Sequence, residues 1–259
     1  MLRSSRLAHR ALYPAAMWLE SYALSIAGRR PNNEDAICAN PELGLFVVAD
    51  GMGGYEGGEV ASALAVDAIH TMVRRTAGPV DVTWPYGLDP ARTLAENELL
   101  TATRLAGDQI AVRRRGPLCE MGSTVVVLRL ADDQAVIAHV GDSRVYRLRG
   151  GGLTQLTTDH SLLAELAATG VVPAPDFAWR HVVTRALGIS ASAPDVQCLP
   201  TAAGDVFLLC SDGLSEVLDP AHIAQLLAAS AETACRALVE AAYAAGSRDN
   251  ISAVVVRVR

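Results

Sequence analysis

The sequence contains no lysine, because all 22 of its basic residues are arginine. Walker A loops, the ATP-pairing site of protein kinases and Schiff-base or pyridoxal mechanisms all need a primary amine, so these chemistries are excluded. The 28 acidic residues outnumber the basic ones and give a formal net charge of −6. This balance argues against a broad electrostatic surface for nucleic acid or anionic membrane, and we expect neither as a partner.

Cysteine is also sparse, and long apolar runs are missing. The five cysteines are widely spaced without a C-x-x-C pair, which is typical of reduced core residues. None is followed six positions later by arginine, so the phosphate-binding loop of cysteine-dependent phosphatases is absent. No apolar run approaches the roughly 18 to 20 residues that span a bilayer. We expect a loose tail at 1–18 rather than a cleaved signal peptide, and a cytoplasmic protein.

The remaining composition is that of a globular domain. Hydrophobic residues make up 51% of the 259 residues and charged residues 19%, and apolar runs alternate with turn signals. We predict strands over 22–27, 44–49, 123–130, 134–140, 143–148, 206–210 and 251–258, and helices over 58–75, 91–115, 161–169, 221–228 and 232–245. Two long helices among many antiparallel strands indicate an α+β fold with helices on the outer faces.

The domain organisation follows from the same pass along the chain. No internal repeat or linker interrupts 19–259, which we interpret as a single domain. A Pro- and Gly-rich surface excursion is expected at 78–90. Residues 161–180 begin as a short helix and continue as an irregular segment, which predicts a flap, since long irregular segments in compact domains are often functional.

Acidic residues beside glycine or other small residues form the most informative pattern. They are Glu34 and Asp35 in RRPNNED, Asp50 in ADGMGG, Asp142 in VGDSR, Asp212 in CSDG and Asp249 in SRDN. Each alone is an ordinary turn former. However, Asp50 and Asp212 each close a wholly apolar strand, and strand ends converge on one rim of a core. Carboxylates gathered there would repel one another unless cations lay among them.

The ligand types favour a hard divalent ion. Carboxylates with backbone carbonyls suit Mg²⁺ or Mn²⁺, whereas zinc sites usually draw on His or Cys. Gly51 has no side chain and could present its carbonyl directly to a metal. The six histidines form no metal-binding spacing, and we interpret each as structural rather than as a ligand.

Eight ordered segments resemble the metal-dependent protein phosphatases, the PPM (type 2C) family, in its bacterial form. They are R-x-x-N-E-D, DGMGG, GST, GDSR, T-x-DHS, TRALG, SDG and RDN, and the resemblance covers the chain from about Ser25 to Val258. The resemblance implies a four-layer sandwich of two antiparallel β-sheets flanked by pairs of helices. It also implies a serine/threonine protein phosphatase that uses a water bridging two metals and forms no covalent phosphoenzyme.

The resemblance also implies roles for individual residues. Asp50 would bridge the two metals, Asp212 and Asp249 would complete one site, and Asp35, assisted by Glu34, would serve the other with the Gly51 carbonyl. Asp142 and Asp212 would hold a third, weaker metal. Arg30 would bind the substrate phosphate, with Arg29 as its rival, because a guanidinium fork suits two phosphoryl oxygens. Thr124, Ser143 and Asn250 would support the acids by hydrogen bonds.

Some questions stay open from the sequence. Many eukaryotic relatives place a histidine after the bridging Asp-Gly as general acid, but this chain has Met52, so its general acid is unidentified. Expected partners are phosphorylated proteins opposing a serine/threonine kinase, with the chain a monomer. One alternative is a catalytically silent regulator that binds phosphoproteins, although such a protein should lack one of the key aspartates. A phosphatase of small metabolites is the other.

Overall fold

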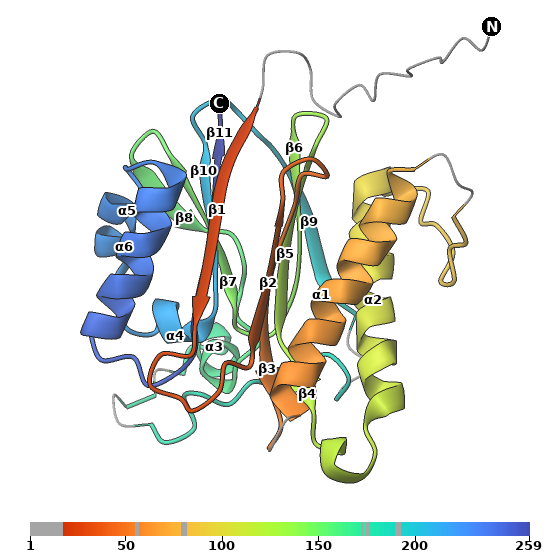
Figure 1. Cartoon of the computed structure of the whole chain (residues 1–259), viewed down its shortest axis with the longest axis horizontal. Helices are drawn as coiled ribbons and strands as arrows, with labels where there is room; N and C mark the ends of the chain where they lie inside the picture. The colour runs from red at the N-terminus through yellow and green to blue at the C-terminus, as the bar shows by residue number, and fades with distance from the viewer. Residues whose placement is uncertain (1–17, 55–56, 79–81, 172, 175–176, 190–192) are drawn as a thin grey trace, which may run out of the picture.

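In the computed structural model, two antiparallel β-sheets pack face to face with helices on both outer faces (Figure 1). The structure describes residues 18–54, 57–78, 82–171, 173–174, 177–189 and 193–259. The expected tail at 1–18 lies outside these residues apart from Trp18, and the expected excursion and flap are described only in part. The α+β prediction with helices outside is confirmed.

The first sheet has the strand order β1-β11-β10-β7-β8, and every neighbouring pair is antiparallel. Its strands are β1 (Leu19–Ile26), β7 (Arg144–Arg149), β8 (Gly152–Gln155), β10 (Val206–Cys210) and β11 (Ile251–Val258). The second sheet has the order β2-β3-β5-β6-β9, with β4 paired to β3. Its strands are β2 (Asp35–Asn40), β3 (Leu45–Met52), β4 (Gly122–Ser123), β5 (Val125–Ala131), β6 (Gln134–Val140) and β9 (Asp195–Pro200).

Six α-helices complete the described part of the chain: α1 (Gly57–Thr76), α2 (Leu94–Arg113), α3 (Leu162–Ala168), α4 (Asp212–Ser215), α5 (Pro220–Leu226) and α6 (Ala231–Ala244). Helices α1 and α2 cover the second sheet, whereas α5 and α6 cover the first (Figure 1). Among the described residues, no helix is both long and apolar enough to cross a bilayer.

Strand β3 shows why central strands of this fold are apolar throughout. Leu45, Val47 and Ala49 face α1 and α2, while Phe46 and Val48 face the first sheet. Side chains alternate between the two faces of a strand, and here both faces are covered. The run from Leu45 to Ala49 is therefore fully buried, and it delivers the polar residues that follow to one end of the sandwich.

The structure corrects several details of the sequence prediction. Strands β2, β8 and β9 were not predicted, because their short segments mix apolar residues with polar ones. Asp50 does not close its strand, since β3 continues through Gly51 and Met52 and pairs there with β4. Helix α2 begins at Leu94 rather than at residue 91. Thr93 caps it, and its hydroxyl and backbone N–H bond reciprocally with Glu96, which ends the preceding loop.

A buried ion pair fastens α2 to the second sheet. The guanidinium Nε of Arg129 on β5 donates to Glu98 of α2 at 2.9 Å, and both side chains are almost fully buried. The Thr76 hydroxyl at the end of α1 also donates to Glu98. One carboxylate thus connects both helices of this layer to the sheet.

Replacing Glu98 by alanine should strongly destabilise the protein, because the charge of Arg129 would stay in the interior without an opposite charge beside it. We expect a loss of about 3–5 kcal/mol in the free energy of unfolding, measured by denaturant titration. The same substitution at Glu240, an exposed residue of α6, should change it by less than about 0.5 kcal/mol. A loss at Glu98 no larger than that at Glu240 would contradict this account.

Candidate metal centre

The β1–β2, β6–β7 and α6–β11 loops meet at one end of the sandwich (Figure 1). Residues of these loops line a cavity of about 450 Å³. It collects most of the acids singled out in the sequence. Its lining consists of Arg30, Glu34, Asp50, Gly51, Met52, Gly53, Gly54, Thr124, Asp142, His181, Val183, Asp212 and Asp249. Both sheets contribute to it, so the rim expected from the apolar strands exists.

Asp50 lies at the centre of this arrangement. It is paired in register with Asp35 across β2 and β3, and its backbone N–H donates to the Thr124 hydroxyl at 3.3 Å. Burial raises the pKa of Asp50 well above its usual value, and the charges of Asp35, Asp212, Asp142 and Asp249 raise it further. In the absence of cations, the ionised form of Asp50 is therefore strongly disfavoured.

Asp35 takes a different position from the other acids. Its Oδ2 accepts hydrogen bonds from Ser211 at 2.9 Å and from Ser252 at 2.6 Å, and it does not line the cavity. Its Oδ1 is buried without a hydrogen-bond partner, and burial raises its pKa to about 7. Ser252 lies on β11 of the first sheet and Ser211 directly follows β10, whereas Asp35 belongs to the second sheet, so this carboxylate joins the sheets beneath the cavity.

Glu34, the neighbour of Asp35, does line the cavity. Its backbone N–H donates to the side-chain oxygen of Asn250 at 2.8 Å, while the Asn250 amide donates to the carbonyls of Ala27 and Asn32. Asn250 thereby shapes the β1–β2 loop that presents Glu34. Burial raises the pKa of the Glu34 carboxyl, and the guanidinium of Arg30 opposes this shift.

Gly51 follows Asp50 and has no room for a side chain. A Cβ built on it would lie 2.0 Å from the carbonyl oxygen of Gly58, at the start of α1. Glycine at this position lets β3 pass against the helix while the Gly51 backbone lines the cavity. The sequence assigned this glycine a backbone role, and its packing requires a residue without a side chain.

Asp142 and Asp212 come from the β6–β7 turn and the start of α4. Burial raises the pKa of Asp142 to about 7, with Asp212 adding to the shift. The pKa of Asp212 is raised to about 6, mainly by burial and further by repulsion from the charges of Glu216 and Asp249. The Oδ1 atom of Asp212 is buried and has no hydrogen-bond partner. Buried carboxylate oxygens without a protein donor are the atoms that a cation would satisfy.

Thr124 and Ser143 lie directly behind these acids. Their hydroxyls are 2.8 Å apart and both are buried. The Thr124 N–H also donates to the carbonyl of Asp50 at 2.8 Å, so the residue bonds Asp50 at both backbone groups. This connection ties the β6–β7 turn to β3 and holds the elements that carry Asp142 and Asp50 in fixed relation.

The two candidate arginines are separated by the structure. Arg30 lines the cavity and forms an ion pair with Asp249 at 2.7 Å, which raises the pKa of its guanidinium. The Arg29 guanidinium instead lies over the ring of Tyr243 at 5.5 Å from the centroid. Arg30 is therefore the arginine that an oxyanion in the cavity would meet.

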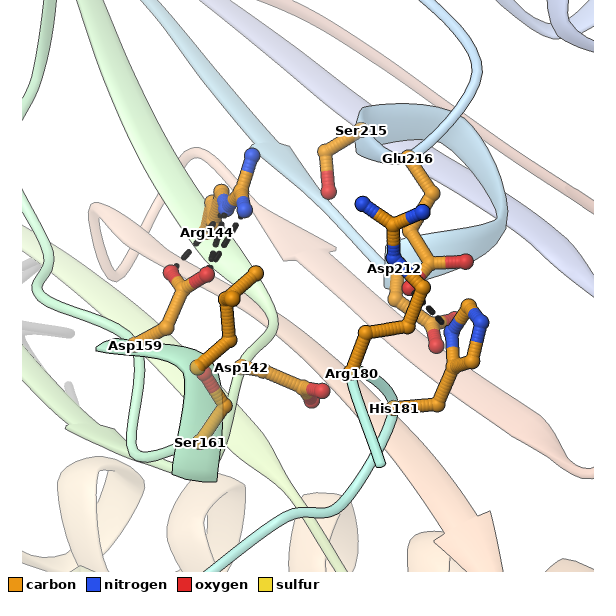
Figure 2. A pocket seen from close by; sticks show the side chains of 10 residues that line it. Asp142, Arg144, Asp159, Ser161, Arg180, His181, Asp212, Ser215 and Glu216 are labelled. Atoms are coloured by element: carbon orange, nitrogen blue, oxygen red, sulfur yellow. Dashed lines mark hydrogen bonds and ion pairs between the residues drawn. The ribbon is translucent and has the colours of Figure 1, made fainter. Parts of the chain in front are cut away.

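A second cavity, of about 330 Å³, adjoins the first and shares Asp142, Asp212 and His181 with it (Figure 2). Arg144 and Asp159 face it from one side in a bidentate ion pair, and His181 and Glu216 face it from the other. The sequence did not assign a function to His181 or Glu216. Glu216 lies one turn after Asp212 and could have been found from that spacing, whereas only long-range packing brings His181 to the acids.

The flap segment is anchored at both ends beside this cavity. His160 at its start receives a hydrogen bond on Nδ1 from the Gly141 N–H at 3.0 Å, next to Asp142. The Thr184 N–H at its far end donates to the His160 carbonyl at 2.8 Å. Burial lowers the pKa of His160, in keeping with a neutral ring whose Nδ1 accepts the hydrogen bond from Gly141. The base of the flap is thus tied to the turn that carries Asp142.

These residues fit a divalent metal centre. Carboxylates of Glu34, Asp50, Asp142, Asp212 and Asp249 converge on one cavity with the Gly51 backbone, and an all-oxygen donor set of this kind suits Mg²⁺ or Mn²⁺. The raised pKa values and the orphaned Asp212 oxygen show that the set is electrostatically incomplete by itself. Among the described residues, Asp35 is the one predicted ligand that stands outside the lining; its Oδ2 accepts from two serines, and its buried Oδ1 has no hydrogen-bond partner.

Comparison with known proteins places the chain in one family. The family described as Protein phosphatase 2C matches residues 28–246, and the chain belongs to this family. The serine/threonine protein phosphatase PstP of Mycobacterium tuberculosis is 36% identical over 88% of this chain, which spans 43% of the length of that relative. The serine/threonine phosphatase stp of Listeria innocua is 34% identical, over 82% of this chain and 83% of its own.

A solved structure bears on the fold and on the metal. The catalytic domain of PstP in complex with two manganese ions matches this chain with a TM-score of 0.80 at 32% identity, covering 93% of this chain and 99% of that one. The four-layer sandwich expected from the resemblance is confirmed. The metal-binding roles of individual residues stay predictions.

The buried acids predict how the stability of the metal-free protein depends on pH. Folded-state pKa values of about 7 for Asp35 and Asp142 and about 6 for Asp212 exceed the ordinary value, so the folded state binds protons more tightly than the unfolded state. This contribution is full near pH 4 and is lost as the pH rises through 6 and 7. In chelator, Tm should fall by at least about 4 °C between pH 5 and pH 8.

Manganese should reverse this loss, because ions that compete with protons for the same oxygens bind better when the carboxyls are ionised. The gain in Tm on adding Mn²⁺ should be larger at pH 8 than at pH 5, measured by differential scanning fluorimetry. Asp212→Asn should weaken both effects. A metal-free Tm that rises steadily from pH 5 to pH 8 would contradict the assignment.

Proposed function

We propose that this chain is a metal-dependent serine/threonine protein phosphatase, which hydrolyses phosphoserine and phosphothreonine esters with water as the nucleophile. The observation that carries the proposal is the convergence of five carboxylates and Arg30 on one cavity, in a member of the Protein phosphatase 2C family. Two of its relatives bear the name of serine/threonine phosphatases. No nucleophilic side chain is needed, since the cavity supplies carboxylate ligands for metal ions and the guanidinium of Arg30 for the phosphate.

Two divalent ions, Mn²⁺ or Mg²⁺, are the implied cofactors. Asp50 would contact both, Asp212 and Asp249 would hold one, and Glu34 with the Gly51 carbonyl would hold the other, while Asp35 braces the strand behind them. Asp142 and Asp212 border both cavities and would form a third, weaker site. When bound, such ions activate a water molecule and neutralise charge on the phosphoryl group.

Arg30 would bind and orient the phosphoryl group. Its guanidinium already pairs with Asp249 at 2.7 Å and is half exposed at the cavity mouth. Two oxygens of a phosphoryl group could bind Arg30 in place of Asp249 or beside it, because a guanidinium presents parallel N–H donors. Phosphate binding and the ligand Asp249 are thereby linked through one side chain.

The rival functions fit the site less well. A catalytically silent regulator has no need for a complete acid set, yet Asp50, Asp212 and Asp249 all line the cavity. A metabolite phosphatase would use the same centre, and PstP and stp are named protein phosphatases. We therefore propose that the substrates are proteins phosphorylated by a serine/threonine kinase. We also propose that the enzyme is monomeric and cytoplasmic, as expected from the sequence.

Asp212→Asn should abolish hydrolysis of a phosphothreonine peptide, because it removes ligand charge without changing side-chain volume. Wild-type activity should be lost in chelator and return with Mn²⁺, followed as release of inorganic phosphate. The matched control is Asp133→Asn, in the exposed β5–β6 turn, where asparagine tolerates the left-handed backbone at φ 60°. Wild-type turnover by Asp212→Asn would contradict the assigned metal site. Comparing the rates on phosphopeptides and on sugar phosphates tests the alternative of a metabolite phosphatase.

Arg30→Ala should mainly raise KM for the phosphopeptide, by roughly ten-fold or more, because it removes an interaction shared by the ground and transition states. Arg29→Ala is the matched control, since the Arg29 guanidinium lies over Tyr243 rather than in the cavity. Steady-state kinetics on both variants checks this. An unchanged KM for Arg30→Ala with a raised KM for Arg29→Ala would reverse the assignment.

A further inference from the structure

Hydrolysis of a serine or threonine phosphate needs a proton for the leaving oxygen, because an alkoxide is a poor leaving group. The residue after Asp50-Gly51 is Met52, whose thioether carries no proton. We propose that His181 supplies this proton and that Glu216 positions its ring. The inference rests on the proposed function and concerns a residue that the sequence left without a role.

Elimination among the residues lining the metal-centre cavity leads to His181. Its carboxylates would be ionised metal ligands, and the guanidinium of Arg30 does not give up a proton in proteins. Thr124 is committed to Ser143 and to the backbone of Asp50. His181 is the one imidazole in this lining, and imidazole exchanges a proton near neutral pH.

His181 lies where a leaving group would pass. It lines the metal-centre cavity and also the adjoining cavity, which opens between Arg144 and Glu216 (Figure 2). Its side chain is 61% exposed, so the ring can reach a bound substrate. A peptide whose phosphoryl group sits among the acids would extend its seryl oxygen and main chain toward this shared border.

Backbone bonds fix the segment that carries His181. The carbonyl of the next residue, Val182, accepts from the Leu162 N–H at 2.9 Å, and Val183 pairs with Ser161 in an antiparallel bridge. The Val182 N–H donates back to the Trp179 carbonyl at 3.2 Å. The histidine is therefore held on a tight turn against the start of α3 rather than on a free strand end.

Glu216 defines the state of the ring. Its Oε1 lies 2.7 Å from Nδ1 of His181. An ionised carboxylate only accepts hydrogen bonds, so Nδ1 carries a hydrogen and Nε2 is the atom that gains and loses the catalytic proton. Glu216 lies one turn after Asp212, and its N–H donates to the Asp212 carbonyl at 2.9 Å, so α4 positions both a predicted ligand and the partner of the proton donor.

Water oxygen forms a bond to phosphorus while the bond from phosphorus to the seryl oxygen breaks, and the electron pair of that bond goes to the seryl oxygen. Nε2–H of the His181 imidazolium gives its proton to this oxygen, which leaves as the alcohol. The attacking water releases one proton to solvent, and the neutral ring regains one from solvent, so hydrogen phosphate and the free alcohol are the products.

The test compares two leaving groups in the Mn²⁺-loaded full chain. Nitrophenolate is stable as an anion and leaves without a proton, whereas a threonine alkoxide does not. His181→Asn can keep a hydrogen bond to Glu216 but holds no transferable proton. It should lower kcat for a phosphothreonine peptide by roughly 10²-fold or more and have a much smaller effect on nitrophenyl phosphate. Glu216→Gln should cause a smaller loss with the same substrate bias.

Each outcome decides the matter. Equal losses on both esters, or none on either, would overturn the role of His181, and wild-type inactivity on both esters with Mn²⁺ would instead defeat the proposed function and the inference with it. His222→Ala, on α5 outside both cavities, is the matched control and should retain wild-type activity on both esters.

A second measurement is independent of turnover. Long-range ¹H–¹⁵N spectra of the metal-free protein, assigned by loss of a signal in His181→Asn, should show the neutral ring of His181 with its hydrogen on Nδ1. Glu216→Gln should shift that population toward the Nε2–H form. A wild-type ring protonated only on Nε2 would overturn the assignment of Glu216 and of the donor atom.

Discussion

The rest of this structure depends on burying several carboxylates together at one end of a sandwich. Desolvation disfavours each ionised acid and mutual repulsion adds to the effect, so the pKa values of Asp50, Asp142 and Asp212 all rise. Such a cluster costs stability at neutral pH unless cations occupy it. The fold tolerates it because the two sheets and two helical layers bury a large apolar core around it.

The same cluster couples the sheets to one another. Asp35 of the second sheet accepts hydrogen bonds from Ser252 of the first sheet and from Ser211, which directly follows β10, and Thr124 joins Asp50 to Ser143 across the neighbouring strands. A shift of one sheet against the other would break these bonds and separate the acids. The geometry of the centre is therefore a property of sheet packing, and residues without direct contact to a ligand help to set it.

The sequence predicted what is local and periodic, and missed what depends on distant partners. Apolar strands such as β10 and β11 and the helix α1 were predicted to within a residue or so, because continuous burial and helical spacing are written into the chain. Strands β2 and β9 were missed, since they owe their form to pairing with β3 and β6. Likewise, neighbouring glycines and other small residues marked the acids in the sequence. The hydrogen bonds from the serines to Asp35 depend on how the two sheets pack, which the sequence pattern does not show.

Placing the proton donor directly after the flap segment separates two tasks. The acids are carried by β3, the β6–β7 turn, α4 and the α6–β11 loop, all tied into the sheets. His181 is carried by a turn that is bonded to the end of α4 through Glu216 and to the start of α3 through backbone bonds. Changes in the flap can thus alter proton delivery and peptide contact together without disturbing a ligand. In a chain with Met52 after Asp50-Gly51, this arrangement restores a proton source to the site from outside the strand that carries the central aspartate.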